Sequence, residues 1–149
     1  MKDRLRILFL CTGNSCRSQM AEGWTRALKN DLIDVYSAGV EIHGLNADAV
    51  KVMAESGVNI SGHASKHIDD FKNCELDAVI TVCGHVHETC PYFPPRCRVI
   101  HAGFDDPPKM TEELAKQGAS REKQLDCFRK VRDEIKAFVE KMPENIFKE

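Results

Sequence analysis

Short apolar runs alternate along the chain with longer segments in which apolar residues recur every three or four positions. Four runs predict strands: Leu5 to Cys11, Asp34 to Val40, Leu76 to Cys83, and Arg98 to His101. Helical spacing or capping residues predict four helices: Ser18 to Leu28, Asn46 to Gly57, His67 to Asn73, and Arg121 to Lys141. Strands that alternate with helices predict an α/β fold with a parallel sheet and right-handed crossovers.

Two of these helices show a clear apolar face that we expect to be buried. The first carries Met20, Ala21, Trp24, Ala27 and Leu28, and the last carries Leu125, Phe128, Val131, Ile135, Phe138 and Val139. No repeat, low-complexity tract or linker interrupts the pattern. We therefore expect a single domain over residues 1–149.

Composition excludes several classes of partner. The chain has 149 residues, of which 42% are hydrophobic and 30% charged, as is usual for a domain with a packed core. The formal net charge of −2 offers no basic face to nucleic acid or anionic lipid. The apolar stretch Ile7 to Cys11 is too short for a signal peptide or a membrane span. We expect a cytoplasmic monomer without nucleic-acid or membrane partners.

Seven cysteines are an odd number, and without a secretory signal they argue against a disulfide scaffold. Catalytic thiols, a metal site or inert buried thiols remain. A zinc site would use three cysteines and three histidines that crowd one region: Cys83, Cys90, Cys97, His85, His87 and His101. Their spacing differs from the short ligand pairs of zinc sites, so we expect no metal and no cofactor.

The first predicted strand ends at a thiol and leads into C-x5-R. The loop consists of Cys11, Thr12, Gly13, Asn14, Ser15, Cys16 and Arg17. A loop of this length can turn its N–H groups into one concavity that binds a tetrahedral oxyanion, aided by the following helix N-terminus. Arg17 can offer two parallel donors to the anion. The alternative is a cysteine that is merely buried at a strand end.

The same positive field favours the thiolate of Cys11, and Ser18 could donate a hydrogen bond to it. An oxyanion would then lie against a ready nucleophile. Cys83 ends the third predicted strand. If the first and third strands are neighbours, about 4.8 Å apart, the two thiols emerge side by side.

The stretch "CTGNSCRSQMAEGW" resembles the phosphate-binding loop and first helix of the low-molecular-weight tyrosine phosphatase fold. It is most similar to the thioredoxin-coupled arsenate reductases built on that fold. "VYSAGVEIHGLN", "VITVCG", "CPYFPP" and "GFDDP" continue the resemblance over nearly the whole chain. The fold it implies is a four-stranded parallel sheet flanked by helices, with the phosphate-binding loop after the first strand.

The resemblance implies that arsenate is reduced to arsenite by a relay of Cys11, Cys83 and Cys90, with thioredoxin reducing the final Cys83–Cys90 disulfide. In a regular helix the Cα atoms of these last two would lie ~10.5 Å apart. A disulfide requires roughly 4.4–6.8 Å, so the segment must bend. The resemblance also implies that Asp106, which precedes Pro107, is the general acid. Asp105 is the alternative acid, and a plain Asp-Pro turn the alternative structure.

Some relatives bind potassium beside the loop through Asn, Glu, Ser and Asp side chains. Asn14, Glu22 and Ser37 match the first three of these, but Lys66 stands in the fourth place. An ammonium group there would repel the ion, so we expect no potassium site.

Two other functions remain open at this stage. A low-molecular-weight protein tyrosine phosphatase would use the loop and the acid but would not require Cys83 or Cys90. A redox-sensing or oxyanion-binding protein would require no acid at all. Turnover of arsenate with a reductant would distinguish the reductase from both.

Overall fold

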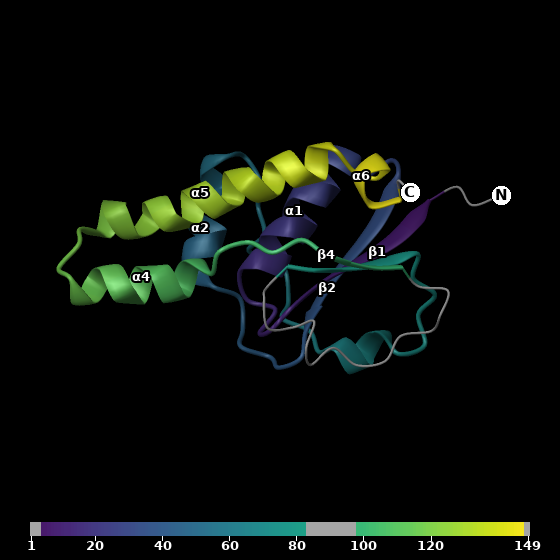
Figure 1. The fold of residues 1–149 in the computed structure, drawn as a ribbon, viewed down its shortest axis with the longest axis horizontal. Helices are drawn as coiled ribbons and strands as arrows, with labels where there is room; N and C mark the ends of the chain where they lie inside the picture. The colour runs from purple at the N-terminus through teal and green to yellow at the C-terminus, as the bar shows by residue number, and fades with distance from the viewer. Residues whose placement is uncertain (1–3, 83–97, 148–149) are drawn as a thin grey trace.

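A computed structural model describes residues 4–82 and 98–147 of the chain. Its central feature is a four-stranded parallel sheet in the order β2-β1-β3-β4. The strands are β1 (Leu5–Cys11), β2 (Ile33–Gly39), β3 (Ala78–Thr81) and β4 (Arg98–His101). The prediction of a four-stranded parallel sheet is confirmed, and β1 lies between β2 and β3 (Figure 1).

The register brings the carboxyl ends of three strands to one edge of the sheet. Cys11 pairs with Gly39 of β2, and Leu10 pairs with Thr81 of β3. The chain passes from β1 to β2 on one side of β1 and then crosses to β3 on its other side. This edge is therefore the switch point at which open α/β sheets bind ligands. The strand β3 is shorter than predicted. It begins at Ala78, because the preceding Asp77 is bonded through its N–H and its carboxylate to the backbone of Arg6.

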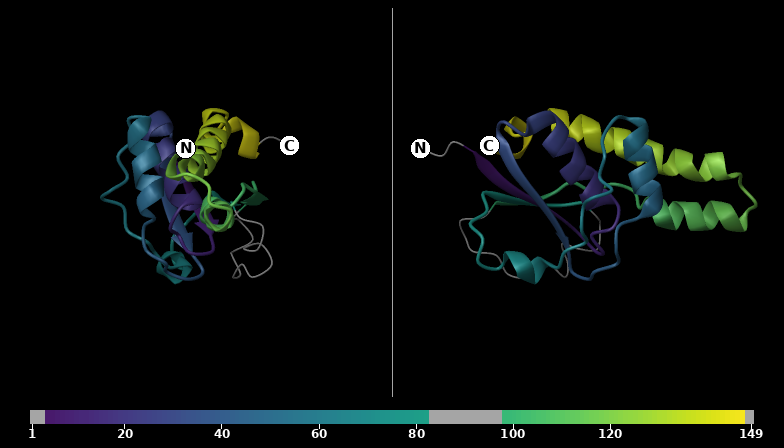
Figure 2. Two further views of the ribbon diagram at one scale, coloured as in Figure 1. Left: turned by 90° about the vertical axis from the view of Figure 1, so that its left-hand side faces the viewer. Right: turned by 180° about the vertical axis from the view of Figure 1, so that it is seen from behind.

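The helices that cover the sheet are α1 (Arg17–Lys29), α2 (Ala47–Glu55), the 3-10 helix η1 (Ile68–Phe71), α4 (Pro107–Lys116), α5 (Arg121–Glu140) and α6 (Glu144–Phe147). Side chains alternate across a strand, and β2 therefore shows which helix lies on which face. Ser37 contacts Glu22 of α1, whereas Tyr36 packs against Phe71 of η1. The helices α1 and η1 thus lie on opposite faces (Figure 2).

The core lies between the sheet and the helices α1 and α5. Ile7, Leu8, Phe9 and Leu10 of β1 are fully buried, as a central strand covered on both faces requires. The predicted apolar face of α5 is buried except for Phe138, which is half-buried. No helix in the described part of the chain is both long and apolar enough to cross a membrane.

Two sequence predictions about helices were wrong. Ala27 and Leu28 were expected on the inner face of α1 but are exposed. Residues 18–25 of α1 are buried on every side among β1, β2, α2 and α5, and the last turn extends beyond these elements.

The helix α4 was not predicted at all. It lies beside α5, and the two form a hairpin that projects from the body of the molecule (Figures 1 and 2). A plain turn at Asp106–Pro107 was the alternative structure in the sequence analysis. The structure shows instead that Asp106 is the N-cap and Pro107 the first residue of a helix.

Candidate active site

The loop between β1 and α1 lines a cavity of about 630 Å³. The carbonyls of Thr12, Gly13 and Ser15 accept hydrogen bonds of 2.9–3.0 Å from N–H groups of the segment 41–46. The loop peptides are trans, so the N–H group that follows each carbonyl points in the opposite direction. The N–H groups that follow these carbonyls therefore point away from the segment 41–46, an arrangement that is compatible with an oxyanion cradle.

Asn14 fixes the position of this loop by hydrogen bonds from its buried side chain to neighbouring segments. It is fully buried and has a positive φ of 49°, a conformation that Asn tolerates better than most residues. Its Oδ1 accepts a bond of 2.6 Å from the N–H of Lys66 and one of 3.1 Å from Nε2 of Gln19. Its Nδ2 donates to Oγ of Ser18 at 2.9 Å. The side chain therefore links the loop to the segment 64–66 and to α1.

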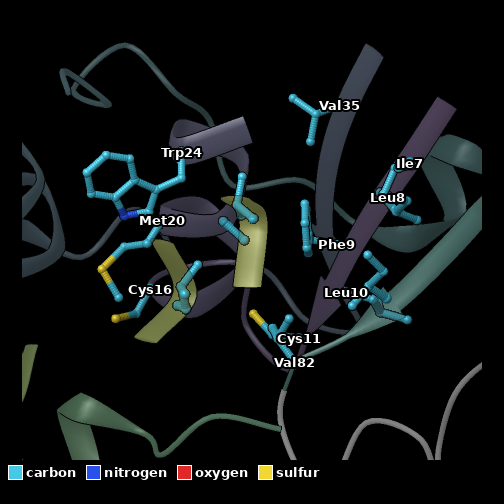
Figure 3. Packing of buried hydrophobic residues seen from close by; sticks show 14 of the residues in the cluster. Ile7, Leu8, Phe9, Leu10, Cys11, Cys16, Met20, Trp24, Val35 and Val82 are labelled. Atoms are coloured by element: carbon cyan, nitrogen blue, oxygen red, sulfur yellow. The ribbon is translucent and has the colours of Figure 1, made fainter. Parts of the chain in front are cut away.

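The candidate nucleophile Cys11 lies at the carboxyl end of β1. It is beside Val82, which directly follows β3 in the chain (Figure 3). Its Sγ is 2.8 Å from Oγ of Ser18. Because Asn14 already donates to that hydroxyl, the hydroxyl proton is free to point at the sulfur. The Ser18 hydroxyl is thus placed to donate a hydrogen bond to Sγ of Cys11, which is the contact that the sequence analysis expected.

Arg17 crosses from the loop to the segment that carries the candidate acid. Its Nη1 donates to the carbonyl of Phe104 at 3.0 Å, and its Nη2 lies 3.6 Å from Oδ1 of Asp106. The Arg17 side chain is only 11% exposed. The guanidinium is therefore fixed at the cavity wall, where it can contact an anion and the acid together.

The structure separates the two aspartates that the sequence left open as acids. Asp106 lies against Arg17, whereas Oδ2 of Asp105 lies 4.0 Å from Nζ of Lys130 on α5. Asp106 is also the N-cap of α4, yet its carboxylate makes no capping bond to the helix. Both aspartates line the cavity, but only Asp106 lies beside Arg17, and Asp106 is therefore the better placed candidate to protonate a leaving oxygen.

Cys16 lies inside the loop and is 3% exposed. Burial raises the pKa of its thiol well above the usual value, and the charge on the neighbouring Cys11 raises it further. Cys16 therefore stays a neutral thiol at pH 7. Because the thiolate is the nucleophile and the neutral thiol is not, Cys16 is not expected to act as a second nucleophile.

The residues that matched a potassium site gather around the buried carboxylate of Glu22. Oγ of Ser37 donates to Oε1 of Glu22 at 2.5 Å, and Nζ of Lys66 lies 3.7 Å from the same oxygen. Arg26 bonds the other carboxylate oxygen at 3.1 Å. The chain itself thus supplies the positive charge that this carboxylate needs, and the residues present do not fit a cation.

Cys83 and Cys90 lie outside the described residues, as do Cys97, His85 and His87 of the alternative zinc site. His101 is described, and its Nδ1 lies 2.9 Å from Oγ1 of Thr81. The neighbouring position of the first and third strands is confirmed. The N–H of Val82, which precedes Cys83 in the chain, donates to the carbonyl of Leu10 at 3.0 Å.

The cavity residues that the sequence analysis missed include two with basic side chains, His43 and Lys109. The ring of His43 lies against Gly13 so closely that a Cβ at Gly13 would be 2.2 Å from its Nδ1, and Nε2 of His43 is 2.7 Å from Oε2 of Glu41. Lys109, in the first turn of α4, also lines the cavity. Only recognition of α4 as a helix could have placed Lys109, three residues after Asp106, on the same helix face.

Comparison with known proteins agrees with this geometry. The profile of the low molecular weight phosphotyrosine protein phosphatase family matches residues 6–149. An arsenate reductase of Halalkalibacterium halodurans is 50% identical over 129 residues, which cover 87% of this chain and 88% of the relative.

Solved structures show the same similarity. An arsenate reductase in its phosphate-binding state is 34% identical, with a TM-score of 0.71, over 95% of this chain and 98% of that chain. A thioredoxin-dependent arsenate reductase of Corynebacterium glutamicum shares the fold, with a TM-score of 0.70 at 22% identity, over 97% of this chain and 63% of that chain. The chain therefore belongs to the low molecular weight phosphotyrosine protein phosphatase family, among the arsenate reductases of that family.

Proposed function

We propose that the protein reduces arsenate to arsenite with Cys11, Cys83 and Cys90 as successive thiols. The observation that carries the proposal is the arrangement around Cys11. Its sulfur is 2.8 Å from the Ser18 hydroxyl, and Cys11 lines one cavity together with Arg17 and most residues of the loop. Arsenate is a tetrahedral oxyanion that suits such a cradle. The arsenate reductases among the relatives support this choice of substrate.

The first step joins sulfur to arsenic. The Cys11 thiolate attacks the arsenic atom of hydrogen arsenate, the bond from arsenic to its hydroxyl group breaks, and that hydroxyl takes a proton from Asp106 and leaves as water. The N–H groups of the loop and Arg17 stabilise the negative charge on the remaining oxygens. No electrons have yet been exchanged with an external reductant.

The second step reduces the arsenic. The Cys83 thiolate attacks the Cys11 sulfur, the As–S bond breaks, and its electron pair leaves with arsenic as arsenite. Cys90 then attacks Cys83, which releases the Cys11 thiolate and leaves a Cys83–Cys90 disulfide. Two thiols have thus been oxidised for each arsenate reduced. The position of Val82 beside Leu10 supports the role of Cys83, which is the next residue in the sequence.

An external dithiol must return the disulfide to two thiols. We propose thioredoxin, because a dithiol protein reduces a disulfide by exchange and requires no cofactor on this chain. Thioredoxin dependence is named for the neighbour from Corynebacterium glutamicum.

The test is NADPH oxidation with thioredoxin reductase, thioredoxin, the protein and arsenate. We expect turnover by the wild type and no turnover by Cys11→Ser, Cys83→Ser or Cys90→Ser. Cys74→Ser, at an exposed cysteine, is the matched control and stays active. Hydrolysis of an aryl phosphate is measured in parallel. Phosphatase activity without arsenate turnover, abolished only in Cys11→Ser, would identify the protein as a phosphatase instead.

A further inference from the structure

One cation at the cavity has no role in the mechanism above. Of the charged groups that line the cavity, Arg17 faces Asp106, and Asp105 faces Lys130. His43, which lies against Gly13 of the loop, is bonded to Glu41. Each of these side chains thus has an ion-pair or hydrogen-bond partner within the protein.

Lys109 differs from the rest. It lines the same cavity, its side chain is exposed, and it makes no ion pair with any residue of the described ranges 4–82 and 98–147. Its positive charge is therefore the one at the cavity mouth that no protein carboxylate in those ranges offsets.

The position of Lys109 is set by the start of α4. Asp106 is the N-cap, and Pro107 and Pro108 occupy the first two helical positions, which their rings pre-organise. Lys109 comes three residues after Asp106 and so lies on the same face of the helix. The backbone therefore keeps the lysine on the cavity side, together with the candidate acid and the positive end of the α4 dipole.

We propose that Lys109 is a specificity-determining residue that attracts small dianionic tetrahedral oxyanions into the cavity and retains them there. This inference rests on the proposed function in one respect, namely that the substrate is such an anion. Lys109 does not touch the reacting sulfur. It acts on binding, and the thiol steps that follow do not depend on it.

The expected effect follows from screened electrostatics. The single positive charge of Lys109 attracts a dianion at the cavity mouth. Salt weakens this attraction over the Debye length, which is about 8 Å at physiological ionic strength. Loss of the charge should lower kcat/KM for arsenate by about three- to tenfold at low ionic strength and by less than about twofold at 0.5 M salt. The change should appear in KM, and kcat should stay the same.

The experiment compares Lys109→Gln, Lys109→Arg and Lys109→Glu with the wild type. Lys116→Gln is the matched control, because Lys116 lies on the same helix, faces Glu112 and is not among the cavity residues. Arsenate turnover is measured over a range of ionic strengths. In parallel, inorganic phosphate is titrated against alkylation of Cys11 by iodoacetamide, followed by mass spectrometry of the Cys11 peptide. The second readout requires no reductase activity.

We expect Lys109→Gln to weaken phosphate protection and raise KM, Lys109→Glu to do so more strongly, and Lys109→Arg to behave like the wild type. If Lys109→Gln matches Lys116→Gln at every ionic strength, the proposal is overturned. If the wild type reduces no arsenate but Lys109→Gln still weakens phosphate protection, the reductase function fails and the role of Lys109 stands. A wild-type loop that phosphate does not protect would overturn both.

Discussion

Replacement of Asn14 by alanine tests whether one buried side chain holds the oxyanion loop in shape. Asn14 is fully buried, adopts a positive φ of 49° and joins the loop to Ser18, Gln19 and Lys66. The Asn14→Ala variant removes all three side-chain bonds and retains a Cβ at the left-handed backbone position.

The cost can be estimated from two effects. Loss of Oδ1 leaves the N–H of Lys66 without its 2.6 Å acceptor, and a buried donor left unsatisfied costs about 1–3 kcal/mol. Gln19 keeps its bonds to the carbonyls of Asn14 and Ala64 and adds little. An alanine in the left-handed conformation adds about 1–2 kcal/mol. The sum of about 2–5 kcal/mol is a large share of the roughly 5–15 kcal/mol that holds a domain together.

Urea unfolding measures this cost, with Trp24, the single tryptophan, as the fluorescent reporter. With a typical slope of about 1–3 kcal/mol per M, we expect the midpoint to fall by about 1 M or more. Asn14→Gly, which relieves the backbone penalty, should be more stable than Asn14→Ala by about 1 kcal/mol. Asn14→Asp keeps an acceptor for Lys66 but loses the donor to Ser18. It should therefore retain much of the stability and still slow alkylation of Cys11 at pH 7.

Stability that is unchanged within about 0.5 kcal/mol in Asn14→Ala would refute this reasoning. The loop would then be held by its backbone bonds to the segment 41–46 alone. Equal stabilities of Asn14→Ala and Asn14→Gly would refute the backbone part of the argument only.

Three further predictions concern charged residues. Asp106→Asn should lower kcat for arsenate by about 10²-fold or more and Asp105→Asn should change it little, and equal losses in the two variants would contradict the assignment of the acid. Turnover should be the same in KCl and NaCl at equal ionic strength, and potassium should stimulate specifically only Lys66→Asp. A hydrogen bond from Arg129 lowers the pKa of Glu55 from its usual 4.5. Its ionised form stabilises the fold above that pH, and the contribution is lost as the pH falls below it. As the pH falls below about 4.5, the melting temperature of Glu55→Gln should therefore decrease less than that of the wild type.

The sequence by itself determined the four strands, their order along the chain and the spacing of the residues in the loop. The apolar run that ends at Cys11 predicted a buried strand of a parallel sheet, and the strand order of the structure places it between two others. The spacing from Cys11 to Arg17 predicted an oxyanion cradle, and the hydrogen bond between Ser18 and Cys11 was predicted with it. These features involve residues that are close together in the sequence, and their geometry therefore follows from the allowed backbone conformations of a short segment.

The tertiary structure decided what depends on contacts between distant segments. Asp105 and Asp106 are adjacent and chemically identical, and only the helix α4 turns one toward Arg17 and the other toward Lys130. That helix was missed because its apolar positions are few and its partner α5 supplies most of its packing. The 3.7 Å approach of Lys66 to Glu22 likewise joins segments 44 positions apart, and no local pattern encodes a distance between such segments.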